Sequence, residues 1–264
     1  QVKAFCSQGG QATTLNSVID KIDVVVVVVL NSVQTEEVLF GQEGLVENLK
    51  PGTVVISCAT VAPTFAIDME KRCKEFEVFY LDAPISGGAL KAKNGQLSIM
   101  ASGVKEAFQH ARPTLDSISE TVFELGDEAG TGSAMKSVNQ LLAGVHIAVM
   151  AEALTFGISQ GISPDKFVEV ISKCAGTSWM LENRAPHIVN GDYKPHSSIN
   201  IWPKDLGIVL DVALESKFNA PIATAALEQF RTAVDMGLGF EDDAAVAKVY
   251  AKSANLSLPK KNDV

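Results

Sequence analysis

Residues 81–103 read LDAPISGGALKAKNGQLSIMASG, in which a turn around Ser-Gly-Gly separates two apolar segments. The pattern predicts two strands, the first of which ends near Asp82 and Pro84. In sheets whose strands are mostly parallel, ligands bind just outside the carboxyl ends of the strands. Glycines there let backbone N–H groups approach an anion, and the hydroxyl of Ser86 can donate one further hydrogen bond. An ordinary strand-to-loop turn also explains these residues, so the segment alone leaves both interpretations open.

Strand and helix patterns alternate through the first half of the chain. Strands are predicted over residues 24–30, 52–60, 77–84, 96–102 and 121–126, and helices over residues 31–41, 62–76 and 105–118. The valine run that starts at Val24 is typical of a parallel strand covered on both faces. Thr60 and Pro63 indicate the cap and the first turn of a helix. The alternation predicts an open, mostly parallel, doubly wound α/β sheet of the Rossmann type.

Strand patterns stop in the second half of the chain. Residues 128–161 predict one long helix that ends at Gly161, and Ser163 with Pro164 predicts the start of the next helix. Further amphipathic helices are predicted over residues 199–217, 221–237 and 241–253. Because no flexible linker separates the two halves, we predict an α/β domain over 1–127 and an all-α domain over 128–264, joined by the long helix.

Composition excludes several classes of partner. The formal net charge is −9 and the isoelectric point is near 5.0, and no cluster of Lys and Arg forms a basic stripe, so a nucleic-acid partner is not expected. The four cysteines are scattered, which favours a reduced, cytoplasmic location. Neither the cysteines nor the histidines have metal-ligand spacing, so no metal site is predicted.

Two apolar runs resemble membrane spans. Residues 24–30 are too few to cross a bilayer. Residues 141–158 are numerous enough, but His146 and Glu152 lie among them. This pattern favours a helix that is buried between domains or subunits, and no membrane partner is expected.

A second candidate for chemistry is the segment GTGSAMKSVNQ, residues 130–140. Lys136, Asn139 and Gln140 stand at i, i+3 and i+4, which places an ammonium group and one or two amides on one face of a helix. A lysine with amide neighbours in a dry cleft can act as a general acid or base if burial lowers its pKa. An exposed lysine on a solvated face is the alternative interpretation.

A third candidate is the segment WPKDLGIVLD, residues 202–211, where Lys204 and Asp205 interrupt an apolar pattern. Such a pair is commonly a surface ion pair that contributes little to stability. Its apolar surroundings in the sequence make a role in a cleft the other possibility.

The segments together resemble the β-hydroxyacid dehydrogenase family, which includes 3-hydroxyisobutyrate, tartronate-semialdehyde and threonate dehydrogenases. Residues 82–103 are similar to the substrate-binding segment of the family, and residues 130–140 to its catalytic helix. Residues 202–211 resemble its Lys-Asp segment and residues 236–250 its closing helix. The resemblance implies a Rossmann-type domain followed by an all-α domain like the C-terminal domain of 6-phosphogluconate dehydrogenase.

The resemblance also assigns roles to residues. Lys136 would be the catalytic acid or base, which exchanges a proton with the substrate hydroxyl while a hydride moves at the same carbon. The carboxylate of a small substrate would lie against Ser86, Gly87 and Gly88, with Asn139 assisting. NAD or NADP would be the cofactor, and the residues expected beside it are Ser32, Thr60 and Lys204.

One family feature has no counterpart here. The family begins with a G-x-G-x-x-G turn that binds the cofactor pyrophosphate, whereas Gly9 and Gly10 are followed by Gln-Ala-Thr. The resemblance starts just after that turn, so we expect the fold to lack its first strand–turn–helix unit, of about 30 residues or more. The residue that selects NAD or NADP would lie in that unit.

Three functions follow as hypotheses. The first is a dehydrogenase that transfers a hydride between NAD(P) and the hydroxyl-bearing carbon of a small 3-hydroxy acid. The second is a truncated, inactive family member that serves as an interaction or oligomerisation module. The third is an imine-reducing relative, which a lysine at position 136 disfavours. A homo-oligomer is expected from the resemblance and from the long apolar helix.

Overall fold

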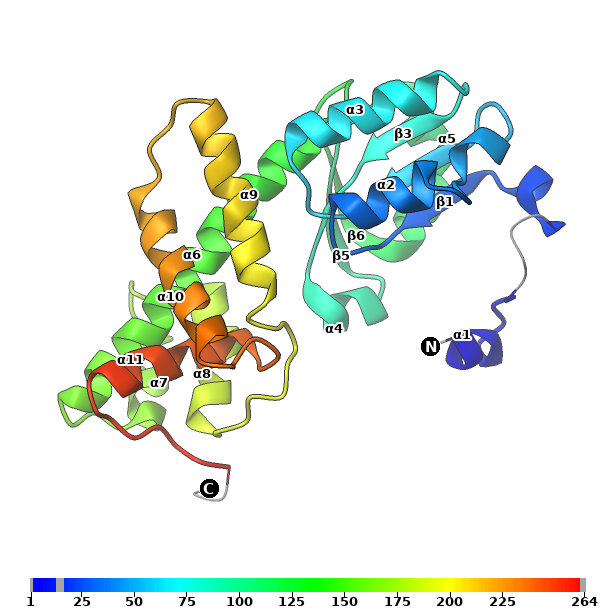
Figure 1. Cartoon of the computed structure of the whole chain (residues 1–264). Coiled ribbons are helices and arrows are strands. Elements are labelled where there is room, and N and C mark those ends of the chain that lie inside the picture. Colours follow the sequence, from blue (N-terminus) through cyan, green and yellow to red (C-terminus); the bar gives the residue numbers. More distant parts are fainter. Residues whose placement is uncertain (1, 13–16, 262–264) are drawn as a thin grey trace. The chain divides into compact units, whose positions relative to one another are not determined.

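A computed structural model of the chain describes residues 2–12 and 17–261 (Figure 1). The chain forms two compact units, Gln1–Ala134 and Met135–Val264. The boundary between them falls inside the longest helix, α6 (Thr131–Ser159). The domain boundary expected from the sequence, after residue 127, precedes this helix. The predicted class, a Rossmann-like α/β domain followed by a helical domain, is confirmed.

The described strands of the first unit form two three-stranded sheets. In one sheet the parallel strands lie in the order β1 (Val24–Val27), β2 (Val54–Ser57) and β3 (Phe79–Asp82). In the other, β4 (Ile85–Ser86) runs antiparallel to β5 (Leu97–Ala101), which pairs in parallel with β6 (Ser119–Glu124). An isolated bridge between Asp82 and Ser102 connects the end of β3 to the end of β5.

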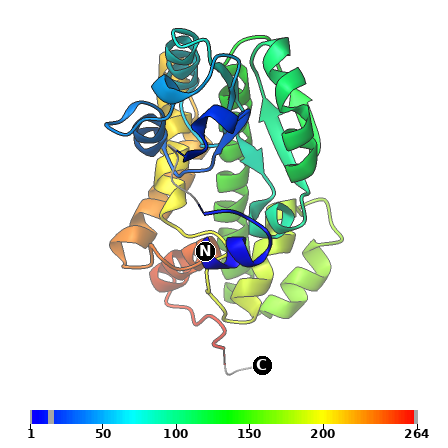
Figure 2. The same ribbon diagram turned by 90° about the vertical axis from the view of Figure 1, so that its right-hand side faces the viewer.

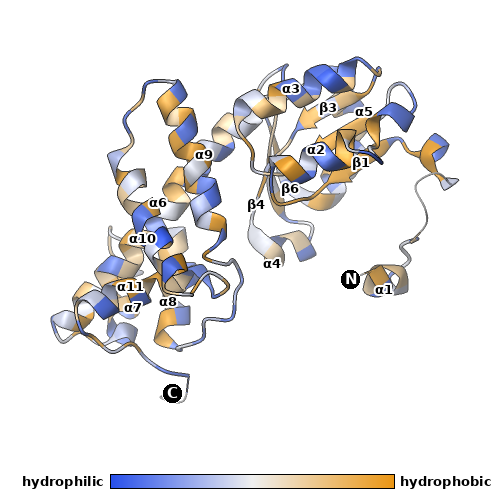
Figure 3. Cartoon of the chain, viewed as in Figure 1, coloured by the Kyte–Doolittle hydropathy of each residue, from blue (hydrophilic) through white to orange (hydrophobic). Residues whose placement is uncertain are grey.

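Helices cover both faces of the strands β2 and β3. The helices of the first unit, 3-10 turns aside, are α1 (Val2–Ser7), α2 (Ser32–Phe40), α3 (Pro63–Lys74), α4 (Gly88–Lys93) and α5 (Lys105–Ile118). Successive strand residues point to opposite faces, so Tyr80 packs in one core cluster with Met69 of α3. Leu81 packs in the other cluster with Phe108 of α5. Figure 3 shows these strands as largely hydrophobic, as the doubly wound prediction requires.

Two local expectations were wrong. Residues 24–30 were expected to form a strand covered on both faces, but only Val24–Val27 form β1, and Val26 and Val28 are 39% and 66% exposed. The reason is that β1 lies at the end of its sheet among the described strands. Thr60 is not the cap of the following helix, because α3 begins at Pro63 with Ala62 in the cap position.

The named elements in the described part of the second unit are all helices (Figure 2), and one isolated antiparallel bridge joins Ser198 to Asp242. After α6 it contains α7 (Pro164–Ile171), α8 (Trp179–Val189), α9 (Ile201–Glu215), α10 (Pro221–Asp235), the 3-10 turn η4 (Asp243–Val246) and α11 (Ala247–Ser253). The side chain of Ser163 accepts a hydrogen bond from the N–H of Lys166, which confirms the predicted cap of α7. Trp202 of α9 stacks on Phe230 of α10, with ring centroids 5.5 Å apart.

Helix α6 runs through the core of this unit. By length and composition it is the one helix among the described residues that could cross a membrane, yet 44% of its most apolar window is buried within the chain. Ile147, Met150 and Leu154 of α6 pack into the core cluster with residues of α8, α9 and α10. A largely apolar helix is accommodated in this way at the centre of a helical domain.

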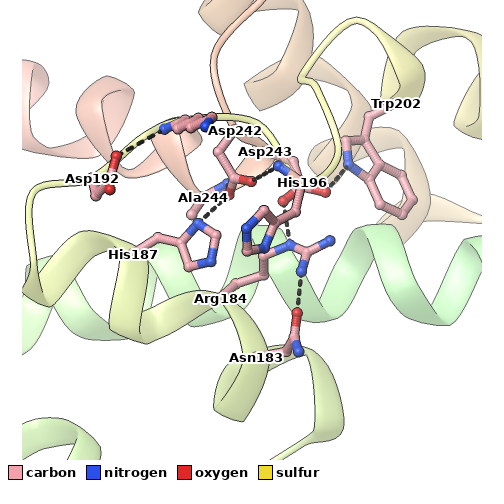
Figure 4. A network of polar contacts seen from close by, with 10 residues as sticks. Asn183, Arg184, His187, Asp192, His196, Trp202, Asp242, Asp243 and Ala244 are labelled. Carbon is pink, nitrogen blue, oxygen red and sulfur yellow. Dashed lines mark hydrogen bonds and ion pairs between the residues drawn. The ribbon is translucent and has the colours of Figure 1, made fainter. Parts of the chain in front are cut away.

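A polar network ties the start of α9 to α8 and η4 (Figure 4). Asp243, which is fully buried, accepts hydrogen bonds from Arg184 Nε at 2.5 Å and from Trp202 Nε1 at 3.0 Å. The neighbouring Asp242, also fully buried, lies 3.1 Å from His187 Nδ1 and accepts a bond from the N–H of His196. Burial alone raises the pKa of Asp242, but these hydrogen bonds lower it to about 2.

The network predicts that the protein loses stability when the buried carboxylate of Asp243 has no cation beside it. Arg184→Met is expected to lower the free energy of unfolding by about 3–5 kcal/mol, because Asp243 then stays buried without its cation. Chemical denaturation of the variant and of the unchanged chain measures this loss.

Two further variants serve as controls. Adding Asp243→Asn to Arg184→Met is expected to restore part of the stability, since no uncompensated charge remains. Lys166→Met removes the exposed ion pair with Glu169 and is expected to change stability little. A loss for Arg184→Met no larger than that for Lys166→Met would contradict the prediction.

Candidate active site

The turn between β4 and α4 has the conformation that its glycines predict. Gly87 and Gly88 have φ angles of +133° and +67°, a region that side chains with a Cβ atom rarely adopt. A Cβ atom added at Gly87 would also lie 2.7 Å from Cβ of Lys91. Ser86 and Gly87 are half-buried and Gly88 is exposed. The turn therefore presents backbone and the half-buried Ser86 where β4 ends and α4 begins.

Ser32 and Thr60, the predicted cofactor residues of the first unit, follow two neighbouring strands. Ser32 begins α2 after β1, and Thr60 follows β2; both are half-buried. Since β1, β2 and β3 are parallel neighbours, their carboxyl ends meet at one edge of the sheet. That edge is where ligands bind in sheets of this kind. The strand pairing thus brings Ser32 and Thr60 to one edge of this sheet. The turn 86–88 instead follows β4 of the other sheet, and its place beside those residues stays a prediction.

Asp82 joins the first motif to the start of the second. Its carboxylate and the hydroxyl of Ser102 accept hydrogen bonds from N–H groups at the beginning of α6. All of these groups belong to the first unit. The sequence interpretation placed Asp82 at a strand end and assigned it no partner. Nothing in its local sequence reveals one, because its partners lie about 50 positions further along the chain.

Lys136 is buried in α6, with 7% of its surface exposed. Burial lowers the pKa of Lys136 to about 8; the nearby carboxylate of Asp205 opposes this change and the ammonium of Lys204 adds to it. The alternative of an exposed lysine on a solvated face is therefore wrong. A lysine with a pKa near 8 can both accept and donate a proton around neutral pH.

A chain of polar contacts within the second unit connects α6 to α9. Asn139 Nδ2 donates to Gln140 Oε1 at 2.9 Å, and Gln140 Nε2 donates to one carboxylate oxygen of Asp205. The other oxygen lies 2.6 Å from Lys204 Nζ. Asp205 is 3% exposed, so Lys204 and Asp205 are not a surface ion pair.

The family resemblance assigned no role to Gln140 or Asp205. In the structure, a hydrogen bond from Gln140 to the buried carboxylate of Asp205 connects α6 to α9. The available signal was the charge pair inside the apolar pattern of residues 202–211. Among the residues that the structure describes, no group of three or more His, Cys, Asp or Glu side chains could hold a metal ion.

Two family models match the chain. Residues 1–126 match the NAD binding domain of 6-phosphogluconate dehydrogenase, and residues 130–250 match the model for NAD binding in NADP-dependent 3-hydroxyisobutyrate dehydrogenase. The chain is 48% identical to an L-threonate dehydrogenase of Cupriavidus necator over 228 residues, which cover 86% of this chain and 77% of that protein. It is 34% identical to a 2-(hydroxymethyl)glutarate dehydrogenase of Eubacterium barkeri, over 97% of this chain and 86% of the relative.

Solved structures are similar as well. A 3-hydroxyisobutyrate dehydrogenase from Salmonella typhimurium has a TM-score of 0.85 at 40% identity, with 89% of this chain and 82% of that chain covered. An imine reductase from Streptomyces aurantiacus has a TM-score of 0.60 at 18% identity over 94% of this chain and 87% of that one. At this low identity, the similarity to the imine reductase shows a shared fold and no shared activity.

The close approach of α6 to the strands predicts a steric effect at Gly132. A Cβ atom there would lie 2.5 Å from the carbonyl oxygen of Asp82 and 2.6 Å from that of Met100. Since neither backbone group can move away without disturbing a strand, Gly132→Ala is expected to lower the free energy of unfolding by about 1–3 kcal/mol.

Gly207 provides the matched control for this measurement by chemical denaturation. It lies inside α9, and an added Cβ atom would meet no atom within 4 Å. Gly207→Ala is therefore expected to raise the free energy of unfolding, by up to about 1 kcal/mol, because alanine favours a helix over glycine. Equal effects of the two substitutions would contradict the steric interpretation.

Proposed function

The chain belongs to the β-hydroxyacid dehydrogenase family, and we propose that it transfers a hydride between NAD(P) and the hydroxyl-bearing carbon of a small 3-hydroxy acid. It is a hydroxyacid dehydrogenase that uses a nicotinamide cofactor. Relatives that are 42–48% identical are named L-threonate dehydrogenases, which makes a threonate-like acid the first substrate to test. The observation that carries the proposal is the buried Lys136, whose pKa is lowered to about 8.

In this proposal Lys136 transfers the proton that accompanies the hydride. In the oxidation direction, its neutral amine accepts the proton of the substrate hydroxyl as the carbon–hydrogen bond breaks. In the reduction direction, its ammonium group donates a proton to the carbonyl oxygen. Asp205 and Lys204 set the charge around the amine, and Gln140 donates a hydrogen bond to Asp205.

The edge of β1, β2 and β3 has a composition that fits the cofactor. The half-buried residues Ser32 and Thr60 follow two adjacent strands there, which is where a dinucleotide binds in sheets of this type. Ser32 is assigned to the loop beside the dinucleotide and Thr60 to the nicotinamide ribose, and the family resemblance adds Lys204 as a further cofactor residue. When bound, the cofactor supplies the hydride acceptor or donor, while the protein supplies position and electrostatics.

The turn 86–88 is assigned to the substrate carboxylate. Gly87 and Gly88 keep this turn free of side chains, and Ser86 adds a hydroxyl donor. Asn139 is assigned a supporting contact to the substrate. A carboxylate needs such donors in this protein, because the chain as a whole carries a net charge of −9.

Other sequence expectations remain proposals. A homo-oligomer stays a proposal, as does a cytoplasmic location, which is compatible with four free cysteines. The expectation of a non-catalytic interaction module stays a prediction, and no contact among the described residues favours it over a dehydrogenase.

Turnover tests the proposed function. The purified chain is incubated with NAD or NADP and a panel of acids that includes L-threonate, 3-hydroxyisobutyrate and glycerate, and the absorbance of the reduced nicotinamide is followed. Lys136→Met is expected to lower kcat by about 10²–10⁴-fold, because the proton acceptor is lost. Absence of nicotinamide turnover with every acid of the panel would rule the proposal out.

The pH dependence has a defined direction. For oxidation, kcat/KM is expected to rise as the pH passes about 8, where Lys136 becomes neutral. For reduction, kcat/KM is expected to fall over the same interval, because the ammonium form is the proton donor.

Two neighbours of Lys136 are expected to shift this profile in opposite directions. Lys204→Met removes a cation that lowers the pKa of Lys136, so the profile moves to higher pH. Asp205→Asn removes an anion that raises this pKa, so the profile moves to lower pH. Lys173→Met, at an exposed lysine, is the control for a change in overall charge. Shifts of the same sign for both variants would contradict the assignment.

A further inference from the structure

Asp82 is a buried carboxylate that the proposed reaction does not use. It ends β3 and is 1% exposed. Its backbone pairs with that of Ser102. The N–H of Asp82 donates to the carbonyl of Ser102 at 3.0 Å, and the N–H of Ser102 donates to the carbonyl of Asp82 at 2.9 Å. A carboxylate enclosed in this way is stable only when hydrogen-bond donors surround it. The donors identify what Asp82 does.

The donors come from the start of α6. One carboxylate oxygen accepts the N–H of Gly130 at 3.0 Å and that of Ser133 at 2.8 Å. The other accepts the hydroxyl of Ser133 at 2.6 Å. The hydroxyl of Ser102 accepts the N–H of Gly132 at 3.0 Å and also bonds to Asp82. We define these residues, Asp82 and Ser102 with Gly130, Gly132 and Ser133, as the α6 clamp.

The α6 clamp replaces an ordinary helix cap. The first N–H groups of a helix have no partner within the helix and are usually satisfied by the side chain just before it. Here they are satisfied by two strand ends, with Asp82 and Ser133 51 positions apart. A negative charge at this end of a helix is also favoured by the helix dipole.

The α6 clamp leaves little freedom at the helix start. Gly130 has a φ angle of +109°, and Gly132 touches the backbone of Asp82 and Met100 so closely that a Cβ atom would not fit. The N–H of Ala134 then makes a first helical bond to the carbonyl of Gly130 at 2.8 Å. The first turn is therefore held both by side chains and by direct backbone contact.

Lys136 depends on this turn. It follows Ser133 by three positions, so the two residues lie on neighbouring parts of one helix face. In an α-helix its N–H bonds to the carbonyl of Gly132, which belongs to the clamp. We propose that Asp82 is a positioning residue, which holds the first turn of α6 and thereby keeps the amine of Lys136 in its buried place. The inference rests on the function proposed for Lys136 and extends it to a residue of the substrate motif.

Asp82 does not act on the substrate itself in this proposal. Both of its carboxylate oxygens are occupied by α6, and almost none of its surface is exposed. The competing explanation is that Asp82 only stabilises the fold. The two explanations differ in whether the loss of Asp82 changes the surroundings of Lys136. Loss of a stabilising contact lowers the free energy of unfolding, whereas loss of positioning also changes the surroundings of the amine of Lys136.

The test compares Asp82→Asn and Ser133→Ala with the unchanged chain. Thr131→Ala, at an exposed residue of the same turn, is the matched control. The rate at which acetic anhydride acetylates Lys136 is measured across a pH series by peptide mass spectrometry, after circular dichroism has shown that each variant is folded. The pH at which the acetylation rate of Lys136 reaches half of its maximum is called the midpoint. In the unchanged chain and in Thr131→Ala, this midpoint is expected near pH 8.

For the two clamp variants the midpoint is expected to move upward by about one pH unit or more, toward the ordinary lysine value of 10.5, because a displaced Lys136 becomes solvated. The kcat for the best acid of the panel is expected to fall by about 10- to 100-fold. The KM for the cofactor is expected to stay within a factor of about two, because the clamp residues are not assigned to cofactor binding.

Folded variants that keep the midpoint of the unchanged chain overturn the inference, whatever their stability. If Asp82→Asn does not fold, Ser133→Ala decides the question, because it removes one hydroxyl and leaves the backbone bonds. The labelling requires no turnover. An unchanged chain that turns over none of the acids therefore overturns the proposed function, while the midpoints still decide the inference about Asp82.

Discussion

A buried carboxylate must be surrounded by donors, and a helix start must find acceptors for its free N–H groups. At Asp82 the two requirements are met by the same hydrogen bonds. This explains the sequence GTGS at the start of α6, residues 130–133: glycine at 132 allows direct contact with the strand backbone, and serine at 133 supplies a hydroxyl donor. The segment of residues 82–103 and the start of α6 are therefore joined by hydrogen bonds within the first unit.

The second unit makes its own contribution to the chemistry of Lys136. Burial lowers the pKa of the amine, and Asp205 limits the effect while it also binds Gln140 and Lys204. These contacts require that α9 keeps its place in the helical core. Trp202, two positions before Lys204, stacks on Phe230 and donates a hydrogen bond to the buried Asp243. The polar network around Asp243 is thus connected through one tryptophan to the first turn of α9, which carries the charges that act on Lys136.

Much of the fold followed from patterns along the chain, and the exceptions have identifiable causes. Apolar segments that alternate with helix patterns predicted β1, β2, β3, β5 and β6 but missed the two-residue strand β4. Ser163 with Pro164 predicted the start of α7. Helix α8 was not predicted, because it is short, has Pro186 inside it and carries a buried Arg184 whose partner Asp243 is distant in sequence. The exposed edge of β1 was also missed, since a valine run does not reveal whether a strand lies at the centre or at the end of a sheet.

The sequence by itself determined the features that depend on neighbours in the chain. These are the strand–turn–helix order, the glycines of the turn 86–88, the helical spacing of Lys136 and Asn139, and the family resemblance. Only the tertiary structure decided that Lys136 is buried, that Asp205 lies beside it, and that Asp82 holds the start of α6. The physical reason is that desolvation and hydrogen bonding are set by residues close in space. For Asp82 and Asp205 those residues lie 51 and 65 positions away, at Ser133 and Gln140.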